Sequence, residues 1–316
     1  MLTRVGTAFC LSERKNEMDG IIPLYKERGM TSFDAVSRLR RILHEKKIGH
    51  SGTLDPEVAG VLPICVGKAT KLVDLLMASG KQYAGELLIG QATETEDLTG
   101  KVIATAPVTA PIPAATIEAA MQKMVGPLTQ IPPMYSAVKV NGKRLYEYAR
   151  AGETVERPKR QVTITSFKLT ATSYDPATQT QRVRFIVDCS KGTYVRTLVV
   201  DLAKALGYPG TMASLTRLKS GGFELDQTLS LADVQDQMSA QLLNLYPLAY
   251  AVRDWPAHEL TPEQWQTVKH GGWLPQASLD QRPAQVALFY QQRLRALYQL
   301  KGTVYKPLKM IDLDED

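Results

Sequence analysis

Apolar residues along this chain recur at two spacings, which predict interspersed strands and helices. Alternation at every second position predicts strands at 83–89 and 183–189. Spacing of three or four predicts amphipathic helices at 33–43 and at 195–206, and Gly207 suits the end of the second helix. Because these elements lack regular strand–helix–strand repeats, an α+β fold is favoured over a doubly wound sheet.

The first of these helices has a clear start signal. Thr31 and Asp34 have the Thr-x-x-Asp pattern typical of a capped helix N-terminus. The stripe that we expect to face the core consists of Phe33, Val36, Leu39, Ile42 and Leu43.

A basic and aromatic segment occupies residues 131–160. Asn141-Gly142 predicts a tight turn in its middle. Around this turn lie Lys143, Arg144, Tyr146 and Tyr148. We expect this segment to extend from the domain and to grip RNA.

The end of the chain has a different pattern, and we expect a domain boundary near residues 245–255. Short apolar runs at 286–290 and 296–300 lie among glycine-rich turns, which predicts a small β domain. The acidic tail at 312–316 is expected to fray.

Residues 1–17 lack the long apolar middle and cleavage site of a secretory signal and show no clear periodicity. We interpret them as a disordered N-terminal extension, with Met18 as the natural start.

Composition narrows the class of protein only a little. The 316 residues are 44% hydrophobic, which is normal for a globular protein with a core. The formal charge of +6 fits a polyanionic partner such as RNA, but it also fits an ordinary basic enzyme. Three distant cysteines indicate free thiols in a reducing cytoplasm rather than a disulfide framework. No apolar run approaches the roughly 18 residues of a membrane span.

The most specific local feature is Asp55, in the turn Gly-His-Ser-Gly-Thr-Leu-Asp-Pro at 49–56. Glycine permits backbone angles that other residues avoid and proline fixes φ, so such a turn can aim the carboxylate outward. An Asp-Pro pair is also an ordinary turn signal. The residues alone leave both interpretations open.

Segment 49–63 and four later stretches, in the same order, resemble the TruB family of tRNA pseudouridine synthases that act on the T arm. The four stretches are Ile-Pro-Pro-Met-Tyr-Ser-Ala-Val-Lys at 131–139, Leu-Tyr-Glu-Tyr-Ala-Arg at 145–150, Cys-Ser-Lys-Gly-Thr-Tyr-Val-Arg-Thr at 189–197 and Leu-Thr-Arg-Leu at 215–218. The resemblance departs from the family's Asp-Lys-Pro triplet at Tyr25 and Glu27, so any structural role of those two positions is in doubt.

The resemblance implies a pseudouridine-synthase catalytic domain at 18–250, with a central mixed or antiparallel sheet flanked by helices. Within it, 127–160 would be an RNA-gripping insertion. The small β-rich domain at 251–316 resembles the PUA domain, an RNA-binding module. The implied reaction is the isomerisation of uridine to pseudouridine at tRNA position 55.

The resemblance also implies roles for single residues. Asp55 matches the essential aspartate, and Arg196 matches the arginine that pairs with it. A carboxylate is both nucleophile and base, so Asp55 could add to the uracil ring, add to the sugar or remove a sugar proton. Tyr194 matches a pocket aromatic whose hydroxyl is a candidate for proton transfer, with packing as the alternative.

Three further residues match positions that receive the extruded base. Tyr83 would stack on the uracil, Leu218 would contact it, and His50 would fill the space that the nucleotide leaves. Without the resemblance, Tyr83 and Leu218 would be assigned to the core, His50 to a loop and Arg196 to the surface.

The candidate RNA-backbone contacts are Lys26, Lys71, Lys143 and Arg144, with Lys68, Arg150 and Arg160 as further basic positions. We expect a cytoplasmic monomer that needs no cofactor, metal, membrane or protein partner and binds the tRNA T stem-loop. The alternatives are an RNA-binding protein without catalysis, or another base-modifying enzyme such as a methyltransferase or a deaminase. The scattered histidines and cysteines do not supply a deaminase zinc set, and no glycine-rich strand-to-helix turn fits a methyl donor.

Overall fold

The structure is a computed structural model that describes residues 18–279 and 281–314; the extension expected at 1–17 lies outside the described residues. Its helices are α1 (Ser32–Ile42), α2 (Val73–Ala78), α3 (Ala114–Gln122), α4 (Leu145–Ala151), α5 (Val195–Ala205), α6 (Leu231–Ser239) and α7 (Pro262–Val268), with short 3₁₀ turns η1 (Gly67–Leu72), η2 (Leu225–Gln227), η3 (Leu248–Val252) and η4 (Gln276–Ser278). The α+β expectation is confirmed.

A nine-stranded sheet, counted over the described residues, organises the larger lobe. Along its path lie β1 (Gly20–Lys26), β3 (Ala59–Val66), β12 (Gly210–Ser220), β4 (Lys81–Ile89), β11 (Thr180–Cys189), β10 (Arg160–Asp175) and β7 (Gly126–Gln130), while β2 (Ile48–His50) pairs with β3 and β13 (Phe223–Glu224) pairs with β12. The β3–β12 pairing is parallel and the other pairings are antiparallel, so the sheet is mixed.

Two short hairpins stand off this sheet. One joins β5 (Gln91–Thr93) to β6 (Val102–Thr105), and the other joins β8 (Lys139–Val140) to β9 (Lys143–Arg144). The second hairpin contains the predicted Asn141-Gly142 turn, in which both residues have positive φ.

One apolar cluster joins the main sheet to α1, α3, α5 and α6. A second cluster packs η1 and α2 against β1 and β3. The periodic stretches therefore became α1, β4, β11 and α5, as predicted, because each contributes one apolar face to a common core.

The stripe on α1 was predicted incorrectly at one end. Phe33 is 66% exposed, whereas its neighbour Ser32 is 2% exposed. The Ser32 hydroxyl donates to the Leu54 carbonyl and accepts from the Leu54 N–H, at 3.2 and 2.9 Å. These bonds satisfy a polar side chain in the core position and turn Phe33 toward solvent.

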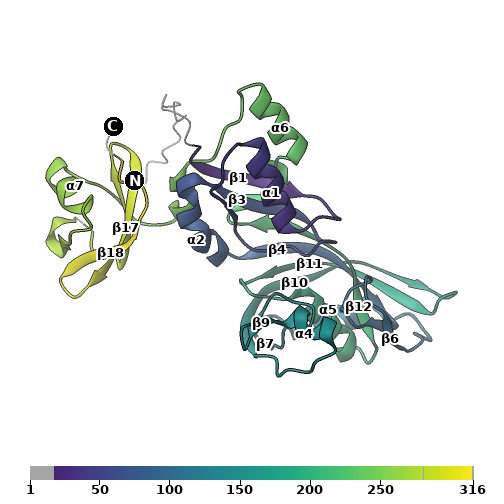
Figure 1. Ribbon diagram of the computed structural model, residues 1–316. Coiled ribbons are helices and arrows are strands. Elements are labelled where there is room, and N and C mark those ends of the chain that lie inside the picture. The colour runs from purple at the N-terminus through teal and green to yellow at the C-terminus, as the bar shows by residue number, and fades with distance from the viewer. Residues whose placement is uncertain (1–17, 280, 315–316) are drawn as a thin grey trace.

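A smaller lobe holds a second sheet, ordered β14 (Ala257–Glu259), β16 (Gln285–Tyr290), β17 (Arg293–Lys301), β18 (Val304–Met310) and β15 (Leu274–Pro275). Figure 1 shows this sheet and α7 set apart from the main sheet, with α2 on the side facing them. The expectation of a small β-rich C-terminal domain is confirmed.

The tail does not fray at 312–314, contrary to prediction. Lys68 forms ion pairs with Asp312 and Asp314, the first at 3.0 Å, and Asp312 is 7% exposed. Asp19 shares the same ammonium at 3.3 Å. These charges fasten the end of the smaller lobe to the larger one.

Candidate active site

Asp55 lies in the turn between β2 and β3. Gly52 has a φ of +99°, which glycine adopts without steric cost. The Asp55 carbonyl accepts from the Val58 N–H at 3.0 Å and closes the turn. The Asp55 side chain remains 43% exposed, so the turn presents its carboxylate to the surroundings.

Arg196 meets this carboxylate from the first turn of α5. Its Nη2 lies 2.9 Å from Asp55 Oδ2, and its side chain is 6% exposed. The same guanidinium donates to the carbonyls of Thr95 and Tyr135 at 2.8 and 2.9 Å. A single buried cation thus ties the Asp55 turn to two other loops, and the predicted pairing of Asp55 with Arg196 is present in the structure.

Arg217 supports the turn from beneath, a role that the sequence analysis missed. It is 1% exposed and donates from Nε to the Val61 carbonyl at 2.7 Å and from Nη2 to the Gly52 carbonyl at 3.1 Å. Gly60 lies against its backbone, since a Cβ there would sit 2.2 Å from the Arg217 oxygen. A charged residue inside the Leu-Thr-Arg-Leu strand was the available signal, because a buried charge needs partners.

Tyr83 is a buried residue of β4 that pairs with Val187 of β11 and Arg217 of β12. Burial raises the pKa of its hydroxyl, and the nearby Arg217 charge opposes that rise. The phenol is therefore neutral at pH 7, and its ring packs in the main apolar cluster. The stacking role stays a prediction.

Leu218 follows Arg217 at an irregularity in β12. The β12 register with β4 shifts between Arg217 and Lys219, which leaves Leu218 as the extra residue of a bulge. Its side chain is half-buried. Bulges re-aim side chains beside active sites, which fits the expected base contact without testing it.

Tyr194 is the N-cap residue of α5 and is half-buried. The Gln130 side chain bonds its backbone N–H and C=O at 2.9 and 3.2 Å. The Arg160 guanidinium lies over its ring, 5.9 Å from the centroid. Tyr194 and Arg196 thus arise from the same helix end, and proton transfer by Tyr194, with packing as the alternative, stays a prediction.

His50 ends β2, just before the Asp55 turn, and is half-buried. Burial lowers its pKa, and the Arg217 charge lowers it further. Among the described residues its buried Nδ1 has no hydrogen-bond partner. A neutral imidazole suits a space-filling role, which stays a prediction.

Lys26 is buried, whereas the predicted contact with an RNA phosphate needs an exposed side chain. It is 0% exposed, and its ammonium donates to the carbonyls of Met30, Glu27 and Pro56 at 2.7, 2.9 and 3.2 Å. Because Pro56 follows Asp55, Lys26 supports the Asp55 turn from inside.

The other candidate RNA contacts lie outside this constellation. Lys71 donates to the Ile311 carbonyl at 2.8 Å, so it joins the two lobes. Lys143 forms an ion pair with Glu153 at 2.9 Å, and Arg144 lies over the Tyr146 ring at 5.8 Å. Their phosphate contacts stay predictions.

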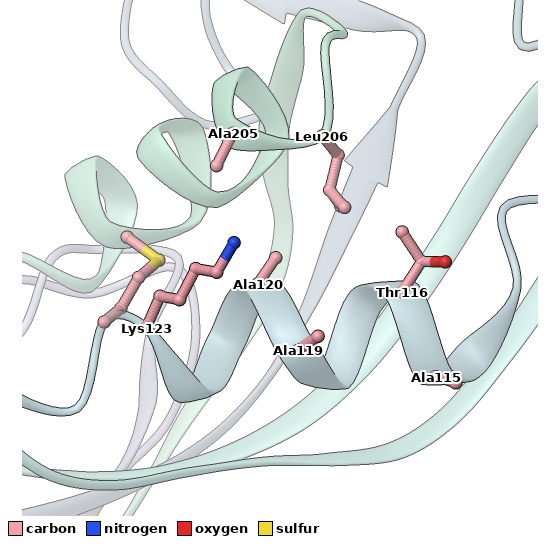
Figure 2. Close-up of a pocket in the computed structure, with 8 residues that line it drawn as sticks. Ala115, Thr116, Ala119, Ala120, Lys123, Ala205 and Leu206 are labelled. Atoms are coloured by element: carbon pink, nitrogen blue, oxygen red, sulfur yellow. The ribbon is translucent and has the colours of Figure 1, made fainter.

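A groove lies away from these residues. Its volume is about 490 Å³, and it lies between α3 and the end of α5. Figure 2 shows the side chains that line it. Alanine methyl groups, Leu206 and the stem of Lys123 line it, and none of the predicted site residues does.

Within 18–279 and 281–314, no group of three His, Cys, Asp or Glu side chains is placed to hold a metal ion. In the same part of the chain, no helix has the length and apolar character needed to cross a membrane.

Comparison with known proteins places this site in a class. The model of the TruB family pseudouridylate synthase N-terminal domain matches residues 40–195, and that of the tRNA pseudouridylate synthase B C-terminal domain matches 196–247. A solved Cbf5–Nop10–Gar1 complex contains a similar chain, with 25% identity, a TM-score of 0.69, and coverage of 93% of this chain and 85% of that one. The fold and the matched models define a pseudouridine synthase.

Curated relatives narrow the class further. The tRNA pseudouridine synthase B of Limosilactobacillus reuteri is 63% identical over 93% of this chain and 99% of the relative. The protein of the same name from Streptococcus pneumoniae is 49% identical over 93% and 99%. The chain belongs to the TruB family.

Proposed function

We propose that this protein is a tRNA pseudouridine synthase that isomerises uridine 55 in the T arm. The observation that carries the proposal is the Asp55–Arg196 ion pair, in which a buried guanidinium orients an accessible carboxylate at 2.9 Å. The names and coverage of the relatives support tRNA as the substrate.

The reaction is an isomerisation, so it needs no co-substrate. The bond from the ribose C1′ to the uracil N1 breaks, and a bond from C1′ to C5 forms. The proton on C5 is lost to a base, and N1 gains one. Asp55 acts at the nucleoside, while Arg196 holds the carboxylate in place.

The target nucleotide must leave the helical stack before Asp55 can reach it. Tyr83 supplies a flat surface that replaces lost stacking, worth about 1–3 kcal/mol per base. Leu218 contacts the base and Tyr194 closes the pocket near C5. His50 occupies the space left in the RNA.

RNA outside the pocket is held by a basic insertion and by the smaller lobe. The insertion at 127–160 carries Lys143 and Arg144 on an exposed hairpin, where cations can meet phosphates. The lobe at 251–316 serves as a PUA-like RNA-binding domain next to the catalytic domain at 18–250. The enzyme works as a cytoplasmic monomer without a cofactor.

The experiment is direct. Purified protein is incubated with unmodified tRNA transcript, and the pseudouridine is mapped by carbodiimide labelling and primer extension. A single new stop that reports position 55 is expected. RNA binding without any pseudouridine would instead support a non-catalytic RNA-binding protein, and a different modified base would support another modifying enzyme.

A further inference from the structure

Gln130 is a buried amide that makes paired hydrogen bonds to the start of the catalytic helix. It ends β7 and is 1% exposed. Its Oε1 accepts from the Tyr194 N–H at 2.9 Å, and its Nε2 donates to the Tyr194 carbonyl at 3.2 Å. The side-chain amide thus makes the same paired hydrogen bonds to Tyr194 that a neighbouring strand would make, although Tyr194 is not part of the sheet.

The partner residue is the N-cap of α5, which has no side-chain cap of its own. The backbone angles of an N-cap residue set the direction in which the first helical turn leaves. Arg196 is two residues further on, in that first turn. Fixing both backbone groups of Tyr194 therefore fixes the base of the arginine that meets Asp55.

The surrounding contacts point the same way. Gln130 pairs through its backbone with Arg160, whose guanidinium lies over the Tyr194 ring. The chain that leaves β7 reaches Tyr135, whose carbonyl accepts from Arg196 at 2.9 Å. The insertion is thus bonded both to the helix start and to its catalytic side chain.

We propose that Gln130 is a positioning residue for the pseudouridine synthase reaction, holding Tyr194 and Arg196 in register with Asp55. This inference depends on the proposed function for its consequence in catalysis, but its structural part does not. Gln130 acts through the α5 N-terminus and does not touch the substrate.

The chain supplies a matched control in Gln181. This glutamine is also 1% exposed, and its amide pairs with both backbone groups of Ile112, at 2.7 and 2.9 Å. It pairs with Ile89 at the far end of β4, about 20 Å along the strand from Tyr83. Gln181 also donates to the Thr172 hydroxyl at 2.8 Å. Loss of either amide removes a pair of backbone bonds from a buried side chain, but only the Gln130 pair lies at the catalytic helix.

The test compares Gln130→Met with Gln181→Met, which keep side-chain volume and lose the amide. We expect Gln130→Met to lower kcat on a T-arm stem-loop by about 10- to 100-fold, because small displacements of catalytic groups are costly. Its dissociation constant for the RNA should stay within about twofold of wild type, and Gln181→Met should leave both quantities within about twofold. Equal losses of kcat in both variants, or an unchanged kcat in Gln130→Met, would overturn the inference.

A second measurement does not depend on activity. Crystal structures of both variants should show the Asp55–Arg196 separation beyond about 4 Å in Gln130→Met only, where an ion pair is no longer made. An intact pair in Gln130→Met would also overturn the inference.

Wild-type protein that makes no pseudouridine would refute the proposed function, and the structures would still decide the role of Gln130. Gln130→Glu, which keeps the acceptor for Tyr194, carries the same test if Gln130→Met does not fold.

Discussion

The Arg196 guanidinium lies 2.9 Å from the Asp55 carboxylate, yet the two side chains differ sharply in burial, at 6% and 43% exposed. Backbone carbonyls hold the buried cation, whereas the anion is partly open to solvent. This arrangement suits a carboxylate that reacts with a bound nucleoside. The buried Arg196 is fixed in place and orients Asp55, while the exposed Asp55 carboxylate can reach the nucleoside.

Replacement of Asp55 by asparagine should abolish turnover and spare binding. Asn keeps the size of the side chain but is neither a nucleophile nor a base, so kcat should fall by more than about 1,000-fold. Removing a negative charge cannot weaken attraction for phosphates, so the RNA dissociation constant should not rise. Single-turnover assays measure the rate, and filter binding measures the dissociation constant. If Asp55→Asn turned over at the wild-type rate, Asp55 would not be the catalytic residue.

Arg196→Lys should be damaging although it keeps the charge. The guanidinium serves Asp55 and the carbonyls of Thr95 and Tyr135 at once, and a single ammonium cannot reproduce that fork. We expect a loss of about 2–4 kcal/mol in the free energy of unfolding, since buried carbonyls lose charged donors. Urea titration measures this loss; a stability equal to wild type would show that the fork is not needed.

Aromatic character, rather than the hydroxyl, should matter at Tyr83. Tyr83→Phe keeps the stacking face and should stay within about fivefold of wild-type kcat/KM, while Tyr83→Ala should lose about 5- to 150-fold. Steady-state assays with a T-arm stem-loop separate the two. A Phe variant as poor as the Ala variant would assign the role to the hydroxyl instead.

Much of the fold was predictable because its signals are local. The capping pattern of Thr31 and Asp34 and the apolar period of α5 depend on neighbours only a few residues away. The strands β3 and β12 were missed as strands. All eight residues of β3 are buried, so its sequence lacks the alternation of apolar and polar residues by which a strand is recognised.

The site was predictable only in part, because its contacts join residues that are far apart in the sequence. The pairing of Asp55 with Arg196 came from family resemblance, since no local pattern records a contact between such distant positions. The buried partners of Arg217, Lys26 and Gln130 are backbone carbonyls and N–H groups that the fold brings together. A sequence marks these side chains only as polar, so Lys26 was misread as a surface cation.

Gly60 should tolerate no side chain, because its backbone lies against that of Arg217. A Cβ would sit 2.2 Å from the Arg217 oxygen, and φ is +116°. Gly60→Ala should therefore destabilise the protein by about 2–4 kcal/mol, from steric overlap added to backbone strain. Gly207 is the control, since its φ is +88° and nothing lies within 4 Å.

Thermal unfolding compares these two alanine variants. Gly207→Ala should cost only the strain of a positive φ, about 1 kcal/mol. Similar shifts of the unfolding temperature in both variants would show that steric overlap with the Arg217 backbone adds nothing to the cost of the Gly60 substitution.

The buried ammonium of Lys26 should make stability depend on pH. Burial lowers its pKa to about 8, against 10.5 for an exposed lysine. Between these values the unfolded chain binds more protons at this site than the folded protein does, so the free energy of unfolding rises with pH. The rise from this residue is about 3 kcal/mol between pH 8 and 10.5.

Lys26→Met removes this titration. The free energy of unfolding of the wild type minus that of the variant should therefore grow by about 3 kcal/mol from pH 8 to pH 10.5. Lys81, whose pKa burial also lowers to about 8, is present in both proteins and cancels. Urea titrations at several pH values measure the difference, and a difference that is flat with pH would mean that Lys26 titrates normally in the folded protein.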